Sequence, residues 1–147
     1  MRVASSRMMA AIRLGLIVVG ALVGGPAMAT SLAVGQTLAC APDGVTAVIG
    51  RMDSGGKDGA TIASISLFDN RAGAKAGVMG HIPLDAQVLA KSCPKTLLPK
   101  ALASDFEGGY AQWRQAFEGG KGGYFTIPVS EILDIVKKMM SEAGAPQ

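Results

Sequence analysis

The chain has few of the side chains that most catalytic and metal sites use. Its 147 residues include one histidine, two cysteines and one tryptophan. These residues show neither the C-x-x-C nor the H-x-x-x-H spacing that pre-organises a zinc site. The sequence also has no G-x-S-x-G nucleophile elbow, so it gives no support to a hydrolase of that type. We therefore expect no metal and no cofactor, and no residue can be assigned a catalytic role from the sequence.

The first 29 residues have the pattern of a secretory signal peptide. Three arginines precede an apolar run at residues 14–23, and a glycine-proline stretch then leads to an A-x-A site at residues 27–29. A membrane-spanning helix needs about 20 predominantly apolar residues, which this segment does not provide. We expect cleavage after Ala29, a single mature domain at residues 30–147 that is periplasmic or secreted, and no stable membrane insertion after cleavage.

Removal of that leader changes the charge of the protein. The whole chain carries 14 basic and 11 acidic side chains, which gives a formal net charge of +3. Three of the basic residues lie in the leader, so the mature chain has 14 − 3 = 11 basic residues against 11 acidic ones. A neutral domain lacks the positive field by which proteins attract nucleic acid or anionic lipid. We therefore expect no nucleic acid among its partners.

The two cysteines, Cys40 and Cys93, belong to a chain that we expect to be exported. In an oxidising compartment an even number of cysteines indicates a disulfide. This bond would close a loop of about 50 residues and stabilise the domain by about 4 kcal/mol on the chain-entropy model. The alternatives are two buried free thiols and a reactive or metal-bound pair.

Alternation with a period of two dominates the first half of the mature chain. Three segments combine apolar or β-branched residues with flanking turn signals, at residues 44–52, 60–68 and 77–84. In the middle segment Ala63, Ile65 and Leu67 share one face, whereas Ser64 and Ser66 share the other, as in a half-buried strand. The three segments predict an antiparallel meander.

Capping residues predict two helices after the meander. Asp85 begins a short helix at residues 85–91, after which prolines at positions 94 and 99 impose a loop. Ser104 and Glu107 have the spacing of a capping box at the start of a longer helix, which Gly119 ends.

The C-terminal part predicts one more strand and one more helix. Residues 124–129 are typical of a strand, and Ser130 caps a final helix with an apolar face. The predicted fold class is therefore α+β, with a small antiparallel meander covered by two or three helices.

Four aromatic side chains recur at helical spacing in the longer helix: Phe106, Tyr110, Trp113 and Phe117. Spacings of three and four residues place them on one helix face. Because a small domain has few other bulky side chains, we expect this stripe to be core rather than a binding surface. Arg114 lies off the stripe and is expected to be solvated.

The single histidine, His81, lies on or near a predicted strand. An imidazole at such a place is expected to face solvent or to bond the backbone. A nucleophile pair with a free Cys93 is the alternative, and it excludes the disulfide because one sulfur cannot serve both roles.

The glycine-rich turn at residues 119–123 resembles a phosphate-binding loop at first sight. In a P-loop a strand precedes, a helix follows, and a serine or threonine comes after the lysine. Here a helix precedes the turn and Gly122 stands after Lys121. The segment instead predicts a helix end and an exposed turn, with Lys121, Gly122 and Gly123 as a possible contact surface.

These observations favour an exported, non-catalytic domain that binds a protein partner or a small ligand, as an accessory subunit or inhibitor does. The alternative is a small exported enzyme that uses His81 with a free Cys93, or carboxylates that only folding brings together. The first hypothesis predicts an exposed apolar patch or a contact at the glycine turn. The second predicts a concave pocket in which ionisable groups converge.

Overall fold

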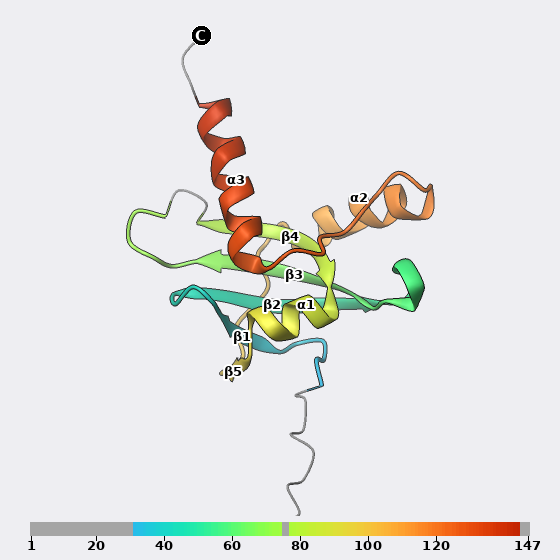
Figure 1. Ribbon diagram of the computed structural model, residues 1–147, viewed down its shortest axis with the longest axis horizontal. Helices are drawn as coiled ribbons and strands as arrows, with labels where there is room; N and C mark the ends of the chain where they lie inside the picture. Colours follow the sequence, from blue (N-terminus) through green and yellow to red (C-terminus); the bar gives the residue numbers. More distant parts are fainter. Residues whose placement is uncertain (1–30, 75–76, 145–147) are drawn as a thin grey trace, which may run out of the picture.

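Hairpin turns and short apolar strands build an antiparallel sheet at the centre of the molecule (Figure 1). The computed structural model describes residues 31–74 and 77–144, so the expected signal peptide lies outside the described residues. The five strands are β1 (Thr37–Cys40), β2 (Val45–Asp53), β3 (Ile62–Asp69), β4 (Val78–Asp85) and β5 (Lys95–Leu97). They are ordered β4-β3-β2-β1-β5, and each pair of neighbours is antiparallel.

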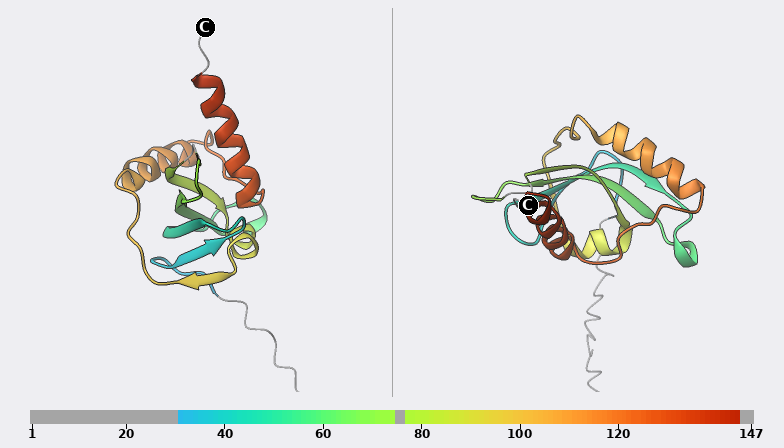
Figure 2. Two further views of the ribbon diagram at one scale, coloured as in Figure 1. Left: turned by 90° about the vertical axis from the view of Figure 1, so that its left-hand side faces the viewer. Right: turned by 90° about the horizontal axis from the view of Figure 1, so that it is seen from above.

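Three helices cover the sheet from both sides. They are α1 (Ala86–Ser92), α2 (Phe106–Glu118) and α3 (Val129–Ala143), and a short 3-10 turn, η1 (Lys57–Gly59), follows β2. Seen from above, α2 lies on one face of the sheet, while α1 and α3 lie on the other (Figure 2). The α+β class and the meander β2-β3-β4 are confirmed. None of the helices in the described part of the chain is long and apolar enough to span a membrane.

Two strands of the sheet were not predicted. β1 has four residues and β5 has three, and Pro94 directly precedes β5. Segments this short show no measurable alternation, and they become strands because β2 and β1 offer edges for pairing. The predicted loop between the prolines is therefore partly strand.

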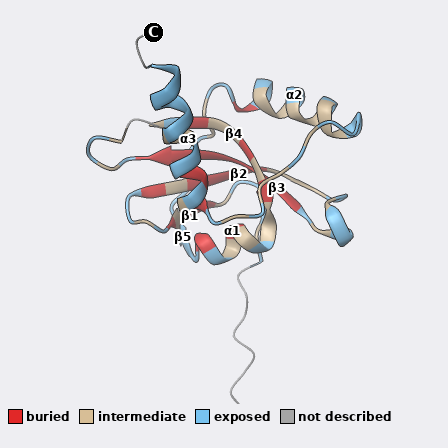
Figure 3. Cartoon of the chain, turned by 45° about the horizontal axis from the view of Figure 1, so that its top comes forward, coloured by how far each residue is buried: buried red, intermediate tan, exposed pale blue. Residues whose placement is uncertain are grey.

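The face of the sheet under α1 and α3 carries the main hydrophobic core. Aliphatic side chains of all four longer strands meet residues of both helices there, among them Leu38, Ile49, Ile65, Leu84, Leu89 and Ile132. Ala63, Ile65 and Leu67 share this face, as the alternation predicts. Buried residues run along the strands in Figure 3.

The opposite face of β3 is buried as well, so the prediction of a half-buried strand was wrong. Every residue of β3 is buried, including Ser64 and Ser66, each with 0% exposure. The helix α2 and the segment before it cover these serines. Residue alternation reports side-chain polarity, and it could not show that hydrogen bonds inside the fold would satisfy the two hydroxyls.

The predicted helix ends were partly right. Asp85 caps α1, because its carboxylate accepts from the N–H groups of Gln87 at 2.8 Å and Val88 at 3.2 Å. Gly119 is the residue at the end of α2. The capping box was wrong: α2 begins at Phe106 with Asp105 as its N-cap residue, and no side chain caps it.

The strand predicted at residues 124–129 was also wrong. Only Phe125 forms a bridge, to Leu84, and α3 begins at Val129 after Pro128 rather than after Ser130. The Phe125 N–H donates to Pro83 O at 2.9 Å, and the Asp85 N–H donates to Phe125 O at 2.8 Å. This single bridge covers the C-terminal end of the outer edge of β4 before the chain turns into the helix.

Candidate functional site

A disulfide joins Cys40 of β1 to Cys93 at the C-terminal end of α1, as predicted. Both cysteines are buried, and the bond spans 53 positions of sequence. It fixes α1 to the sheet next to the point where the Ala41 N–H donates to Ser92 O at 2.9 Å. Because Cys93 carries no thiol, the proposed nucleophile pair with His81 does not exist in this structure.

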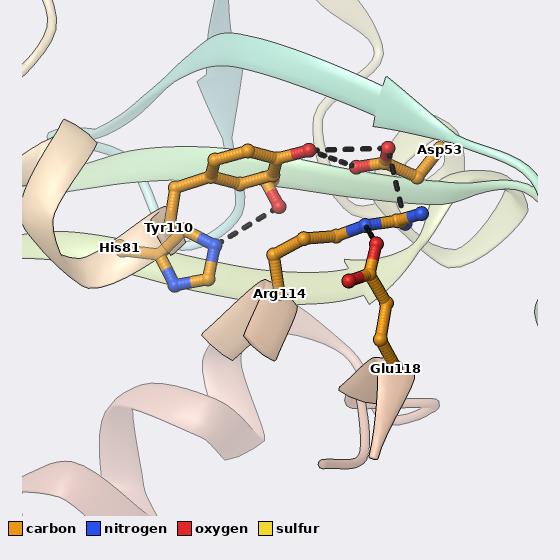
Figure 4. A network of polar contacts seen from close by, with 6 residues as sticks. Asp53, His81, Tyr110, Arg114 and Glu118 are labelled. Carbon is orange, nitrogen blue, oxygen red and sulfur yellow. Dashed lines mark hydrogen bonds and ion pairs between the residues drawn. The ribbon is translucent and has the colours of Figure 1, made fainter. Parts of the chain in front are cut away.

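His81 lies on β4 and points to the α2 side of the sheet (Figure 4). Its Nε2 lies 2.9 Å from Ser64 Oγ, so the imidazole bonds a buried hydroxyl instead of the backbone. Its ring meets those of Phe106 and Tyr110 edge-on, with centroid distances of 5.6 and 5.8 Å. Burial among these groups lowers the pKa of His81, and the charge of Asp53 opposes that shift.

A second group of polar contacts begins beside His81 and follows α2 (Figure 4). The Tyr110 hydroxyl donates to the Asp53 carboxylate at 3.0 Å. Arg114 contacts the same carboxylate at 3.4 Å and Glu118 at 2.7 Å, so it is paired rather than simply solvated. Burial, and then the bond to Asp53, raise the pKa of Tyr110.

This network binds α2 to the sheet, and its geometry does not suit nucleophilic catalysis. A serine nucleophile must reach a substrate, but Ser64 is 0% exposed in the middle of β3. Asp53 bonds Tyr110 and Arg114 instead of orienting the imidazole, as the third member of a triad would. In the described residues, every buried side-chain nitrogen and oxygen has a hydrogen-bond partner.

Two glycines allow α2 to lie this close to the sheet. The ring of Phe106 occupies the space that a side chain at Gly50 on β2 would need. On α2 itself, a Cβ atom at Gly109 would approach His81 Cβ to 2.7 Å, which is closer than real Cβ contacts. Glycine inside a helix costs about 1 kcal/mol relative to alanine, so Gly109 was a sequence signal for close packing.

The aromatic stripe is core at its N-terminal end and becomes more exposed along α2. Phe106 is fully buried, whereas Tyr110, Trp113 and Phe117 are only partly buried. Trp113 and Phe117 stack with centroids 5.0 Å apart. The structural interpretation of the stripe is confirmed for Phe106, while the other three rings share their surface between the sheet and solvent.

The glycine-rich turn after α2 folds back onto the helix. The backbone N–H groups of Lys121 and Gly122 donate to Ala116 O at 2.8 and 3.0 Å. The Trp113 indole donates to Gly123 O at 2.7 Å. These donors are engaged within the chain and do not form a phosphate cradle. Lys121 and Gly123 are exposed and Gly122 is partly buried, and their role as a contact surface stays a prediction.

A hollow lies beside α1, on the side of the sheet away from His81. It has a volume of about 390 Å³, and we call it the α1 groove. Its lining is mostly apolar and consists of Leu32, Leu38, Gln87, Ala90, Lys91, Cys93 and Pro94. Two neighbouring hollows of about 370 and 310 Å³ also border α1. None of the three includes a member of the His81 network among its lining residues.

The carboxylates of the fold do not form a metal centre. No group of three or more His, Cys, Asp or Glu side chains in residues 31–74 and 77–144 could hold a metal ion. Sequence reasoning missed the α1 groove, because its residues come from separate segments and form no motif.

The chain matches no model of a known protein family, and it matches neither a curated protein nor a solved structure.

Proposed function

We propose that this protein is an exported, non-catalytic domain that binds a protein partner. One observation supports this most strongly: the hollows and the converging ionisable groups lie on opposite faces of the sheet. An enzyme pocket combines a concave surface with polar groups that point into it. Here the face with His81, Asp53 and Tyr110 is covered by α2, and the α1 groove on the other face is mainly apolar.

The chemistry of the α1 groove favours a partner with apolar side chains. Its only polar lining residues are Gln87 and Lys91, both on the exposed side of α1. Small-molecule sites usually add several placed polar groups that fix the ligand's orientation. Exposed apolar surface bordered by polar residues is instead typical of protein contact sites.

Export is supported by two independent features. The N-terminal sequence has the pattern of a cleaved leader, and the buried disulfide requires an oxidising environment to persist. We expect the exported protein to begin at Thr30, which intact-mass measurement of the periplasmic or culture fraction would show. Recovery of only a full-length, membrane-integral form would contradict export.

Site-specific photo-crosslinking in the exporting cell tests the binding function. The photoreactive residue p-benzoyl-phenylalanine is placed at position 90 in the α1 groove, at position 121 in the glycine turn and at position 112 on exposed α2. We expect one discrete, light-dependent protein adduct at position 90, suppressed by excess purified domain and reproduced with the purified partner. Absence of a saturable adduct at all three positions would refute the proposal.

A further inference from the structure

The two edges of the sheet differ in how they are protected. The edge of β4 is covered at its C-terminal end by Phe125, which bonds both Pro83 and Asp85 through its backbone. At the other end of the sheet, β5 pairs with β1 and with no other strand of residues 31–74 and 77–144, and every residue from 94 to 101 is exposed. An edge strand presents unpaired N–H and C=O groups on its outer side, which can pair with another extended chain.

Apolar surface lies directly beside this open edge. Leu97 is 43% exposed and Leu98 is 88% exposed, which is unusual for two consecutive leucines. The α1 groove begins at Pro94, the residue before β5. Thr96 pairs with Leu38, so both side chains lie on the face of the sheet where Leu38 lines the groove.

The charge around β5 has one sign. Residues 86–104 contain Lys91, Lys95 and Lys100 and no aspartate or glutamate. No ion pair with a described carboxylate involves these lysines. The Lys100 ammonium lies over the Phe68 ring at 3.8 Å from its centroid, so Lys91 and Lys95 are the two charges of this group left for a partner. This is a local excess in a mature chain that we expect to be neutral. Lys91 lines the groove and Lys95 lies on β5 itself, so the positive charge accompanies the open edge.

We infer that β5 and the α1 groove form one docking surface for an acidic, extended segment of the partner protein. The segment adds a sixth strand to the sheet by backbone hydrogen bonds to β5, and its alternate apolar side chains face the groove. Acidic side chains between them point to the opposite face of the sheet, where Lys95 lies because it is adjacent to Thr96 on β5, while Lys91 borders the groove itself. This inference rests on the proposed binding function and names the chemistry of the partner.

The lysine on β5 also restricts which strands can pair with this edge. A charged residue on an edge disfavours pairing with neutral or basic chains, because the charge would lose water without gaining a partner. An acidic strand restores that interaction. Lys95 therefore contributes selectivity as well as attraction.

Titration with defined peptides tests the inference on the disulfide-bonded mature domain. The probe is the fluorescein-labelled peptide ELEVELG with an amidated C-terminus, and its controls are KLKVKLG and an ELEVELG peptide methylated on alternate backbone nitrogens. We expect saturable binding of the acidic peptide and no saturable binding of either control, because one has the wrong charge and the other cannot pair as a strand.

Matched charge reversals locate the surface. The double variant Lys91→Glu/Lys95→Glu should weaken binding about tenfold or more, since rim charges change sign at two points. Lys121→Glu and Lys138→Glu reverse exposed charges elsewhere and should leave the affinity unchanged. Filling the groove with Ala90→Trp should also weaken binding, and thermal melts establish that each variant is folded.

The outcomes separate this inference from the proposed function. Peptide binding that persists in Lys91→Glu/Lys95→Glu, or a crosslinked partner found only at position 121 or 112, overturns the inference and leaves the binding function intact. A concentration-dependent dimer that Lys95→Glu changes would show that a second copy of this chain occupies the edge, which also overturns it. No crosslinked partner at any position overturns both.

Discussion

The two faces of the sheet are both covered by helices, but they are held together by different interactions. Under α1 and α3 the contacts are aliphatic and the disulfide adds a covalent link. Under α2 the contacts combine buried hydroxyls, one imidazole and aromatic rings, which bond each other across the interface. Every buried side-chain nitrogen and oxygen in the described residues has a hydrogen-bond partner, and the hollows beside α1 lie on the apolar face.

This difference follows from the nature of the interactions. Hydrogen bonds are directional, and a buried group without a partner costs free energy, so a polar interface is stable only when it is complete. Apolar side chains need no such partners, so an apolar interface can be stable even where part of its surface stays uncovered. The short helix α1 covers only part of its face and leaves apolar surface along its sides. The ionisable residues thus serve the fold, and the surface that we propose for a partner is on the other side.

Loss of the Phe106 ring should have the largest effect on the polar face. Phe106→Ala removes a fully buried ring above Gly50, and truncation of a core phenylalanine costs about 3–5 kcal/mol of unfolding free energy. Trp113→Ala should cost less, because Trp113 is partly exposed. Urea denaturation of both variants measures the difference. An equal or larger effect at Trp113 would contradict the gradient of burial along α2.

Removal of the disulfide should have the next largest effect, on the apolar face. Replacing both Cys40 and Cys93 by alanine should lower the unfolding free energy by about 2–5 kcal/mol, since the unfolded chain gains freedom and α1 loses its link to β1. Denaturant titration checks this value. Thiol counting on the unmodified, denatured protein should find no titratable thiol, and a count of two would contradict the bond.

Ser64→Ala probes the polar face at a single bond. The change leaves His81 Nε2 without its partner inside the fold, which should cost about 1–3 kcal/mol. Ser104→Ala is the matched control, because Ser104 is exposed and does not cap α2. That variant should stay within about 0.5 kcal/mol. A loss of about 1 kcal/mol at Ser104 would restore the capping box that the structure does not show.

The pH dependence of stability should show the smallest of these effects. Burial lowers the pKa of His81 below its ordinary value of 6.5 in the folded state. As pH falls below 6.5, the unfolded chain therefore binds a proton before the folded one does, and stability decreases toward the lower folded-state pKa. Above pH 6.5 this contribution is constant. Unfolding free energies from pH 8 to 5 measure the loss, and His81→Gln should remove it.

The elements that the sequence predicted correctly are the ones that local chemistry determines. The meander follows from alternation and turn residues, the start of α1 from the carboxylate of Asp85, and the disulfide from two cysteines in a chain that we expect to be exported. Each of these predictions uses only residues close together in the sequence or, for the disulfide, the number of cysteines.

The features that the sequence did not predict depend on contacts between distant segments. The strand β5 exists because β1 provides an edge, and Ser64 is buried because His81 satisfies it. At the start of α2, Asp105 packs against Gly80 on β4 instead of leaving the cap to Ser104. The α1 groove combines residues from the N-terminal segment, β1 and α1. No local pattern marks such combinations.

An NMR titration tests the central claim that the partner binds beside α1 and β5 rather than on the α2 face. The ¹H–¹⁵N spectrum of the disulfide-bonded domain is recorded with increasing ELEVELG peptide. The account predicts shifts for the amides of Leu38, Ala90 and Thr96, while the indole signal of the single tryptophan, Trp113, stays in place. Shifts confined to the Trp113 indole and the amides of His81 and Tyr110 would contradict it.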